Sequence, residues 1–415
     1  MAAATPPIPD EHPEPARLPV SEPGLPGLAD EPPDAGPGLA ERLAAGDPLA
    51  APDQWLRLAC CPGLGATRIA RLVARYGGPD ALLDRDAAAL AALGIRDREV
   101  LAALTAPPSP ELAAARAWLE ASGHHLLPLD DPRYPAGLRE LDDPPPVLFV
   151  NGDPDSVAWP GVAVVGTRKP SPAGVEQAEA LAAGLARAGL SVVSGLALGI
   201  DGAAHRGALE AEGPTVAVLG CGPDQVYPHR HRQLAAAIRE GGALVAELPP
   251  GTPPVRHQFP RRNRIIAGMT LGTVVVEAAR RSGSLITARL ALEAGREVMA
   301  VPGPVRNPGS RGCHRLIRDG ARLVESAADV IEEVAPGIVV PATEEAAPTA
   351  AGGRSPEADR VLEALGAEPE NVDTLVERCG LTPETVSSML ILLELEGAVV
   401  AAPGGRYGRA TKRPS

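Results

Sequence analysis

Residues 162–174 read VAVVGTRKPSPAG, four apolar residues that stop at Gly166 and continue into a polar segment containing two prolines. A short continuous apolar run that ends at glycine is typical of a strand buried on both faces and closed by a tight turn. A helix is expected after the prolines, from Val175 onward. Strand, turn and helix together predict the first unit of an alternating α/β fold.

The same alternation continues through residue 303. Helices are expected to begin near Asp201, His231 and Leu285, and the segment before residue 273 is expected to be a long loop. Buried strands separated by amphipathic helices predict a doubly wound parallel sheet of the Rossmann-like class. Five further segments have the composition of such strands: LSVVSG (190–195), TVAVLG (215–220), ALVAEL (243–248), TVVVEA (273–278) and EVMAVPG (297–303).

The turn GTRK (166–169) is a candidate anion site, because sheets of this type bind ligands at the carboxyl ends of their strands. Gly166 permits close approach of the backbone, and Arg168 and Lys169 supply positive charge. The chain contains neither GxGxxG nor GxxxxGK[ST], so no nicotinamide, P-loop nucleotide or other cofactor is predicted. A plain strand-to-helix turn is the alternative interpretation.

A second stretch at the same expected edge, RRSGSLITAR (280–289), also favours an anion. It follows a buried strand and places Ser282, Gly283 and Ser284 at the start of a helix, where backbone amides and the helix dipole attract negative charge. One mononucleotide needs only one such turn. Several of them on one sheet edge suit a polyphosphate chain.

The stretch HQFPRRNRIIAG (257–268) sets one of only two phenylalanines, Phe259, beside Arg261, Arg262 and Arg264. A cationic groove with an aromatic surface holds single-stranded nucleic acid without sequence preference. The alternative is that Phe259 packs in the core while the arginines form a solvated face. Which of Arg261 and Arg262 faces a ligand is left open by the sequence.

The net charge of −13 does not exclude a nucleic-acid partner, because the acidity is unevenly distributed. Residues 1–50 hold nine acidic and two basic residues, a balance of −7. Residues 161–335 hold 20 basic and 16 acidic residues, a balance of +4. The middle of the chain is therefore able to present a basic surface.

Several functional classes are disfavoured by the sequence. Ser194, Asp201 and His205 suggest a hydrolase triad, but the last two are four residues apart on one expected helix and no GxSxG elbow is present. Five cysteines without ligand spacing indicate neither a disulfide framework nor a metal site, which suits a reducing cytoplasm. No signal sequence is predicted, because the N-terminus is acidic and Pro-rich and lacks the basic and then apolar order of a signal peptide. No membrane span is predicted, because no apolar run approaches about 18 residues.

The composition predicts five segments. An acidic, Pro-rich tail at 1–50 precedes a helical domain at 51–125, whose PGLG turn (62–65) resembles a helix-hairpin-helix or SAM-like fold. The Rossmann-like domain spans 126–335, a linker spans 336–354, and a winged helix-turn-helix spans 355–410. An ordinary turn in a small helical domain is the alternative for PGLG.

The chain resembles the DNA-processing protein A family, also called DprA or Smf, over about residues 129–330. The resemblance includes VVSGLALGIDGAAHRGAL (192–209) and VVVEAARRSGSLITARLALEAGREVMAVPG (274–303), in order and at natural spacing. The shorter matching motifs are LDDPRYP (129–135), VVGTRKPS (164–171), VLGCGPDQVYP (218–228), FPRRNRIIAG (259–268) and LIRDGARLV (316–324).

The resemblance implies a cytoplasmic, non-enzymatic bacterial protein that binds single-stranded DNA. Such proteins protect incoming strands in natural transformation, help load the RecA recombinase, displace the single-strand-binding protein, and act as homodimers. Matched motifs assign the DNA pocket to Gly166, Thr167, Arg168, Ser194, Gly195, Arg256, Phe259, Asn263 and Arg264. Two positions depart from the family pattern: Ala246 stands where serine is usual, and His231 where asparagine is common.

Two other functions are weighed against DNA binding. A nucleoside monophosphate phosphoribohydrolase would use the same sheet edge with Glu277 as its acid, but the PGGxGT loop of such enzymes is absent. A transcription regulator led by the winged helix would bind duplex DNA in a sequence-specific way.

Overall fold

The computed structural model describes residues 51–336, 356–365, 370–395, 398–402 and 406–409. The predicted acidic tail and residues 337–354 of the predicted linker lie outside the described residues. The chain divides into two compact units, residues 1–340 and 341–415, and each is described by itself.

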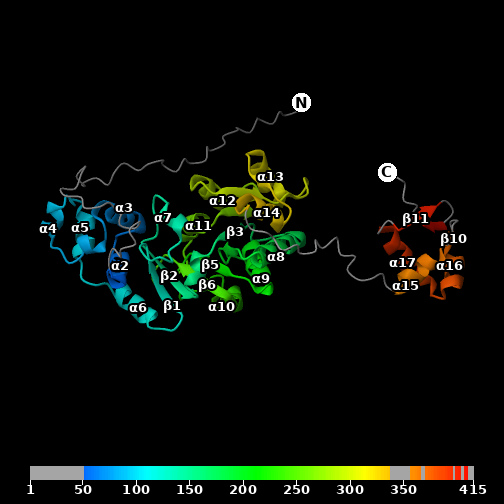
Figure 1. Ribbon diagram of the computed structural model, residues 1–415, viewed down its shortest axis with the longest axis horizontal. Coiled ribbons are helices and arrows are strands. Elements are labelled where there is room, and N and C mark those ends of the chain that lie inside the picture. Colours follow the sequence, from blue (N-terminus) through cyan, green and yellow to red (C-terminus); the bar gives the residue numbers. More distant parts are fainter. Residues whose placement is uncertain (1–50, 337–355, 366–369, 396–397, 403–405, 410–415) are drawn as a thin grey trace, which may run out of the picture. The chain divides into compact units, whose positions relative to one another are not determined.

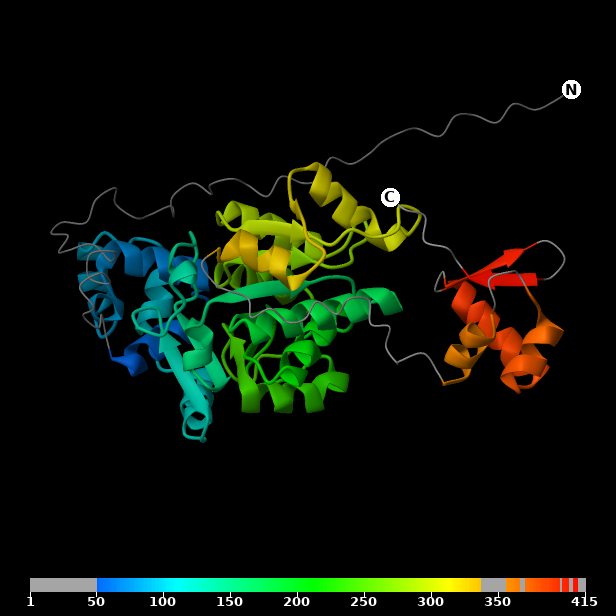
Figure 2. The same ribbon diagram turned by 45° about the vertical axis from the view of Figure 1, so that its right-hand side comes forward.

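The first unit begins with a helical region. α2 and α3 flank the turn Pro62–Gly65, in which Gly63 adopts a φ of 76° that favours glycine. Trp118 of α6 packs edge-on against Phe149 of the sheet, so helices and sheet share one core, and the blue helices adjoin the cyan strands in both views (Figures 1 and 2). The helices are α2 (Pro52–Ala59), α3 (Ala66–Tyr76), η1 (Pro79–Ala81), α4 (Ala87–Ala92), α5 (Arg98–Thr105) and α6 (Pro110–Leu119).

A nine-stranded sheet in the order β1-β2-β6-β5-β4-β3-β7-β8-β9 forms the centre of this unit. Strands β3 to β8 run parallel, as the apolar runs predict, and β9, which was not predicted, adds to β8 in parallel. β1 and β2 join the other edge antiparallel and were not predicted as a pair. The strands are β1 (His124–Pro128), β2 (Val147–Gly152), β3 (Gly161–Val165), β4 (Ser191–Ser194), β5 (Thr215–Leu219), β6 (Gly242–Ala246), β7 (Gly272–Val275), β8 (Glu297–Ala300) and β9 (Arg322–Leu323).

The strand order reverses between β3 and β7. From β3 the chain adds β4, β5 and β6 outward on one side, and it then returns to place β7 on the other side of β3. Ligands of doubly wound sheets bind in the crevice at such a reversal, outside the carboxyl ends of the strands. The turn after Val165 and the loop after Val275 both begin there.

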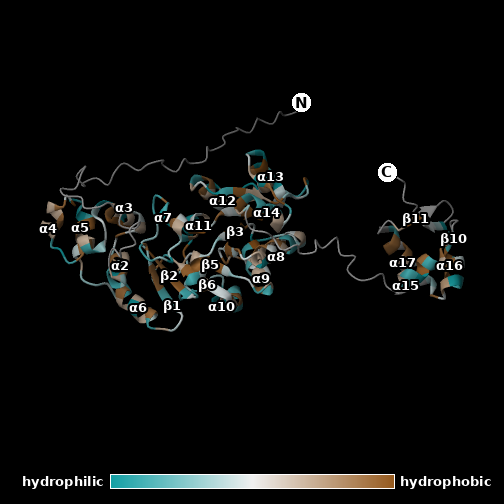
Figure 3. Ribbon diagram, viewed as in Figure 1, coloured by the Kyte–Doolittle hydropathy of each residue, from teal (hydrophilic) through white to brown (hydrophobic). Residues whose placement is uncertain are grey.

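Helices cover both faces of the sheet, and β3 shows why. Val162 and Val164 belong to the core under α8, α9 and α14, while Ala163 and Val165 belong to the core that includes α11 and α12. The covering helices show apolar and polar residues around their circumference (Figure 3). They are α7 (Ala136–Arg139), α8 (Pro172–Arg187), α9 (Ile200–Glu210), α10 (Arg232–Gly241), α11 (Gln258–Gly268), α12 (Ser284–Glu293), α13 (Arg311–Arg318) and α14 (Ala327–Val334), with the short turns η2 (Asp155–Ala158), η3 (His229–His231) and η4 (Pro308–Ser310).

The prediction of a long loop between β6 and β7 is wrong, because α11 occupies residues 258–268. Pro260 sits in the first turn of α11, where a missing N–H costs little. Ile265 and Ile266 are fully buried and hold the helix against the sheet. The basic stretch is therefore carried by a rigid element.

The second unit is a winged helix, as predicted. Its helices pack Val361, Leu375, Val386 and Leu393 into a small core beside the three-stranded sheet β10-β12-β11. The elements are α15 (Pro356–Ala364), β10 (Glu370–Asn371), α16 (Val372–Cys379), α17 (Pro383–Leu395), β11 (Val399–Ala402) and β12 (Arg406–Arg409). Among the described residues of both units, no helix is long and apolar enough to cross a membrane.

Candidate nucleic-acid interface

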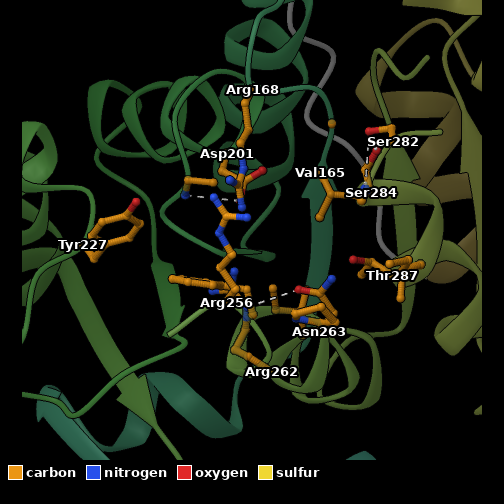
Figure 4. Close-up of a pocket in the computed structure, with 17 residues that line it drawn as sticks. Val165, Arg168, Asp201, Tyr227, Arg256, Arg262, Asn263, Ser282, Ser284 and Thr287 are labelled. Atoms are coloured by element: carbon orange, nitrogen blue, oxygen red, sulfur yellow. Dashed lines mark hydrogen bonds between the residues drawn. The ribbon is translucent and has the colours of Figure 1, made fainter. Parts of the chain in front are cut away.

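A pocket of about 610 Å³ opens at the reversal of strand order. It lies between the turn after β3, the loops after β4 and β5, helix α11 and the start of α12, and Figure 4 shows Tyr227 on one side and Ser282, Ser284 and Thr287 on the other. Its walls are formed by Val165, Gly166, Arg168, Ala197, Asp201, Tyr227, Arg256, Phe259, Pro260, Arg262, Asn263, Ser282, Gly283, Ser284, Ile266, Ile286 and Thr287.

The GTRK turn is fixed by backbone contacts to its neighbours. Thr167 donates its amide to the Glu277 carbonyl at 2.7 Å and accepts from the Ile200 amide at 3.2 Å. A Cβ at Gly166 would lie 2.5 Å from the Ile200 side chain, so only glycine fits. The turn brings exposed Arg168 to the pocket, but neither Thr167 nor Lys169 lines it.

Ser194 and Gly195 differ in position although they are adjacent. Ser194 is buried and donates its hydroxyl to the Val164 carbonyl at 2.7 Å, tying β4 to β3. It does not line the pocket, and Gly195 instead lines a small side pocket that adjoins it. The predicted contact of Ser194 with a ligand therefore does not fit this geometry.

Arg262 organises the floor of the pocket. Its guanidinium is buried and donates to the Gly195 carbonyl at 2.8 Å and to the Val218 carbonyl, at the ends of two neighbouring strands. Burial lowers the pKa of Arg262 to about 10, against the opposing effect of Asp201, and the group stays charged at neutral pH. Of the two arginines left open by the sequence, Arg262 lines the pocket and Arg261 does not.

Asp201 sits beside Arg262 and is already engaged. One carboxylate oxygen accepts from the Gly195 amide at 3.2 Å and from the Ala197 amide at 3.3 Å. Burial raises the pKa of Asp201, and Arg262 opposes that shift. Asp201 therefore shapes the loop after β4 and offsets part of the charge on Arg262.

Arg264 has a structural position, in contrast to its predicted contact with phosphate. Its side chain is only 9% exposed and donates to Asp143 at 3.0 Å and to Glu247 at 2.6 Å. Arg261, two-fifths exposed, lies 3.8 Å from the same Glu247 carboxylate. Both side chains point to acidic partners, and neither lines the pocket.

Two exposed arginines supply the accessible charge. Within the part of the chain that the structure describes, neither Arg168 nor Arg256 forms a salt bridge within 4.0 Å, and both line the pocket. With buried Arg262 they make three cations against the single anion Asp201 on the pocket walls. Figure 4 shows these charged side chains clustered in the middle of the site. The pocket carries a positive excess that suits an anion.

The start of α12 forms the opposite wall. Ser282 and Ser284 share a hydroxyl hydrogen bond of 2.7 Å, and Gly283 caps the helix between them. The three residues line the pocket at the positive end of a helix dipole, and their contact with nucleic acid stays a prediction. Asn263 also lines it and accepts from the Arg262 side chain at 3.2 Å.

Aromatic surface accompanies the charge. Phe259, half-buried on the first turn of α11, lies 5.5 Å from Tyr227 between ring centroids, with the ring planes at 41°. Tyr227 is 44% exposed and was missed as a site residue, although it lies in the motif VLGCGPDQVYP. An aromatic residue within a matched motif, in a chain with only 2% aromatic residues, was the available signal.

The groups proposed for catalysis have other partners. His205 is buried against Thr215, with 2.7 Å between the ring nitrogen and the hydroxyl, and burial lowers its pKa to about 3. Glu277 accepts from the Ser171 amide at 3.0 Å and from its hydroxyl at 2.8 Å, and it does not line the pocket. No group of three or more potential metal-ligating side chains occurs in the described residues.

The two departures from the family pattern are accommodated within the fold. His231 donates from its ring Nδ1 to the Leu196 carbonyl at 2.9 Å, and it packs against Gly202. Ala246 is buried at the end of β6, paired with Phe149. Neither residue lines the pocket.

Fold and site together define a Rossmann-like α/β protein with a cationic, aromatic-lined pocket at the reversal of its sheet. Family models match residues 125–335, as DNA recombination-mediator protein A, and residues 345–405, as the DprA winged helix domain. The chain belongs to the DNA-processing protein A (DprA/Smf) family, which confirms the resemblance found in the sequence.

Relatives and a solved structure match between about half and two thirds of the chain. Protein Smf of Escherichia coli (strain K12) is 44% identical over 288 residues, covering 68% of this chain and 75% of that protein. DNA processing protein DprA of Streptococcus pneumoniae is 47% identical over 205 residues, 49% of this chain and 72% of that one. The X-ray structure of the S. pneumoniae protein superimposes with a TM-score of 0.60 at 36% identity, covering 69% of this chain and 98% of that structure.

Proposed function

We propose that this DNA-processing protein binds single-stranded DNA as a non-catalytic recombination mediator. It would protect incoming strands in the cytoplasm during natural transformation and help load RecA recombinase in place of the single-strand-binding protein, acting as a homodimer. The DNA would be held by Gly166 and Arg168 of the GTRK turn, by Ser282, Gly283 and Ser284 at the start of α12, and by Arg256, Phe259 and Asn263 at α11, with Gly195 at the side pocket. Thr167 and Lys169 of the same turn would contact the strand outside the pocket.

One observation carries the proposal: the pocket joins unpaired cations to exposed aromatic surface. Arg168 and Arg256 reach it without a salt-bridge partner among the described residues, while Tyr227 and Phe259 line it with aromatic side chains. Charge attracts the phosphates of any nucleic acid, whereas stacking needs bases that are not already paired in a duplex. This combination favours a single strand over double-stranded DNA.

The family supports the remaining parts. The matching model is named for a recombination mediator, and the S. pneumoniae relative is named a DNA processing protein. RecA, the single-strand-binding protein and the homodimer are proposed on the family resemblance. Glu277, the acid that a nucleotide hydrolase would need, accepts hydrogen bonds from the amide and the hydroxyl of Ser171. The alternative of a nucleotide hydrolase therefore gains no support.

Quantitative binding of oligo-dT across a salt series tests the proposal. We expect steep salt dependence and a preference for single-stranded over duplex DNA. The double variant Arg168→Ala, Arg256→Ala should bind all sequences more weakly and reduce the slope of log K against log salt by roughly 1.4, about 0.7 per lost phosphate contact. Arg261→Ala is the matched control, because Arg261 is an exposed arginine of α11 that does not line the pocket.

Unchanged affinity in the double variant would overturn this assignment of the pocket. RecA filament formation on strands coated with single-strand-binding protein provides a second arm of the same experiment. The wild-type protein should accelerate it, and the double variant should not.

A further inference from the structure

A second group of exposed cations adjoins the pocket without lining it. These side chains follow the carboxyl ends of β3, β7 and β8, and one of them begins α13. Within the part of the chain that the structure describes, none of them forms a salt bridge within 4.0 Å. The group, called the basic strip below, consists of Lys169, Arg280, Arg281, Arg306 and Arg311.

The loops that carry the basic strip contain no acidic residue. They span residues 166–171, 278–283 and 301–311. Within residues 278–318 the acids are Glu293, at the end of α12, and Glu297, at the start of β8, and both lie at the opposite, amino edge of the sheet. The basic strip is therefore a surface of one sign, which attracts a polyanion.

Glu277, which is buried, holds two of these loops against the end of β7. Its carboxylate accepts from the amide and the hydroxyl of Ser171, at 3.0 Å and 2.8 Å, and its backbone carbonyl accepts from the Thr167 amide at 2.7 Å. Gly309 lies so close to the same carboxylate that a Cβ there would overlap it. The loops after β3 and β8 are thus fixed to one residue, and their cations are held at one edge of the sheet.

The start of α13 is fixed to the loop after β7. Gly312 donates its amide to the Ala278 carbonyl at 2.7 Å. Arg311 therefore lies next to the strand end that leads into residues 280–284. The first two of these five residues belong to the basic strip, and the last three line the pocket. The basic strip and the pocket are therefore neighbours along one loop.

We propose that the basic strip is a second nucleic-acid contact, which holds the phosphates of a single strand where that strand leaves the pocket past α12 toward α13. The three loops contain no aromatic residue, so the contact acts through charge and is independent of base sequence. This inference rests on the proposed function and extends it to a longer site. The pocket and the basic strip bind successive segments of one strand.

A length series of oligo-dT, from about 4 to about 16 nucleotides, tests the inference, because this range covers the site sizes of single-strand binders. The variant Arg281→Ala, Arg306→Ala removes one exposed cation from each of two loops. On the longest strand, the slope of log K against log salt should fall by roughly 1.4, about 0.7 per lost phosphate contact. On the shortest strand, which fills only the pocket, the variant and the wild type should bind alike.

Arg187→Ala, Arg239→Ala is the matched control, because these exposed arginines lie in the last turns of α8 and α10, at the amino edge of the sheet. It removes the same charge and should leave the salt slope unchanged at every length. Equal loss on short and long strands, or a variant that behaves like this control, overturns the inference. The proposed function then stands if wild-type binding is steep in salt and requires Arg168 and Arg256. Absence of wild-type binding to oligo-dT of any length overturns both.

Discussion

The sheet-edge pocket and the winged helix both have features associated with DNA binding, but they differ in charge. The pocket has three arginines and one aspartate on its walls. In the winged helix, α17 stands where the recognition helix of such folds lies, yet residues 383–395 contain no lysine or arginine. Residues 356–409 hold ten acidic and four basic residues. A fold that often reads DNA is here the less suitable surface, because phosphate contacts need cations.

The comparison also applies within α11. Arg262 lines the pocket, whereas Arg264, two residues further on, is tied to Asp143 and Glu247. The same residue type thus serves the ligand site in one position and the fold in the other. Partners decide which role each arginine has.

The largest expected effect follows from Arg264. Arg264→Ala would leave Glu247, itself only 8% exposed, without its buried partner. Removal of one member of a buried ion pair costs about 3–5 kcal/mol of unfolding free energy. Chemical denaturation should show that loss, while Arg168→Ala should stay within about 0.5 kcal/mol of wild type. Equal stability of the two variants would mean that Arg264 has no larger structural role than Arg168.

Much of the fold could be predicted from the sequence, and the α11 arginines show where prediction stopped. Each parallel strand is a continuous apolar run, so VAVVG and its successors were recognisable locally. α11 was missed because Pro260 and the polar residues around it hide the helical period. The partner of Arg264 lies 121 residues away at Asp143, and only the folded sheet brings the two together.

The site was predicted only in part, because local motifs are visible in the sequence and contacts between distant segments are not. Gly166, Arg168, Phe259, Asn263, Ser282 and Ser284 could be predicted because each lies in a motif that is recognisable in the sequence, and all of them line the pocket. Tyr227 lies in the loop after β5, and its approach to Phe259 depends on the order of strands in the sheet. Local patterns do not contain that order.

A second effect, of intermediate size, concerns the buried histidine His205 of α9. Histidine in an unfolded chain takes up a proton near pH 6.5, but the pKa of buried His205 is about 3. Between these values the unfolded state binds more protons. His205 therefore lowers stability progressively as pH falls from about 6.5 to 3, by up to about 1.4 kcal/mol per pH unit.

Unfolding free energies measured at several pH values, for wild type and His205→Asn, isolate this contribution. The variant is less stable at neutral pH because it loses the contact with Thr215, but its stability should fall less steeply on acidification. Parallel curves would show that His205 accepts a proton in the folded protein. No such difference is expected from substitutions in the winged helix.

The smallest expected effect comes from the winged helix itself. Arg378 already pairs with Glu370 at 2.9 Å, and Arg406 is exposed on β12 within an acidic unit. If the pocket is the DNA-binding site, the full-length variant Arg378→Ala, Arg406→Ala should change the affinity for single-stranded and duplex oligonucleotides by less than about twofold. The reason is that the acidic surroundings of these arginines offset any weak phosphate contact. A loss as large as that of the Arg168 and Arg256 double variant would reverse the comparison, because it would place phosphate contacts on a surface whose net charge opposes them.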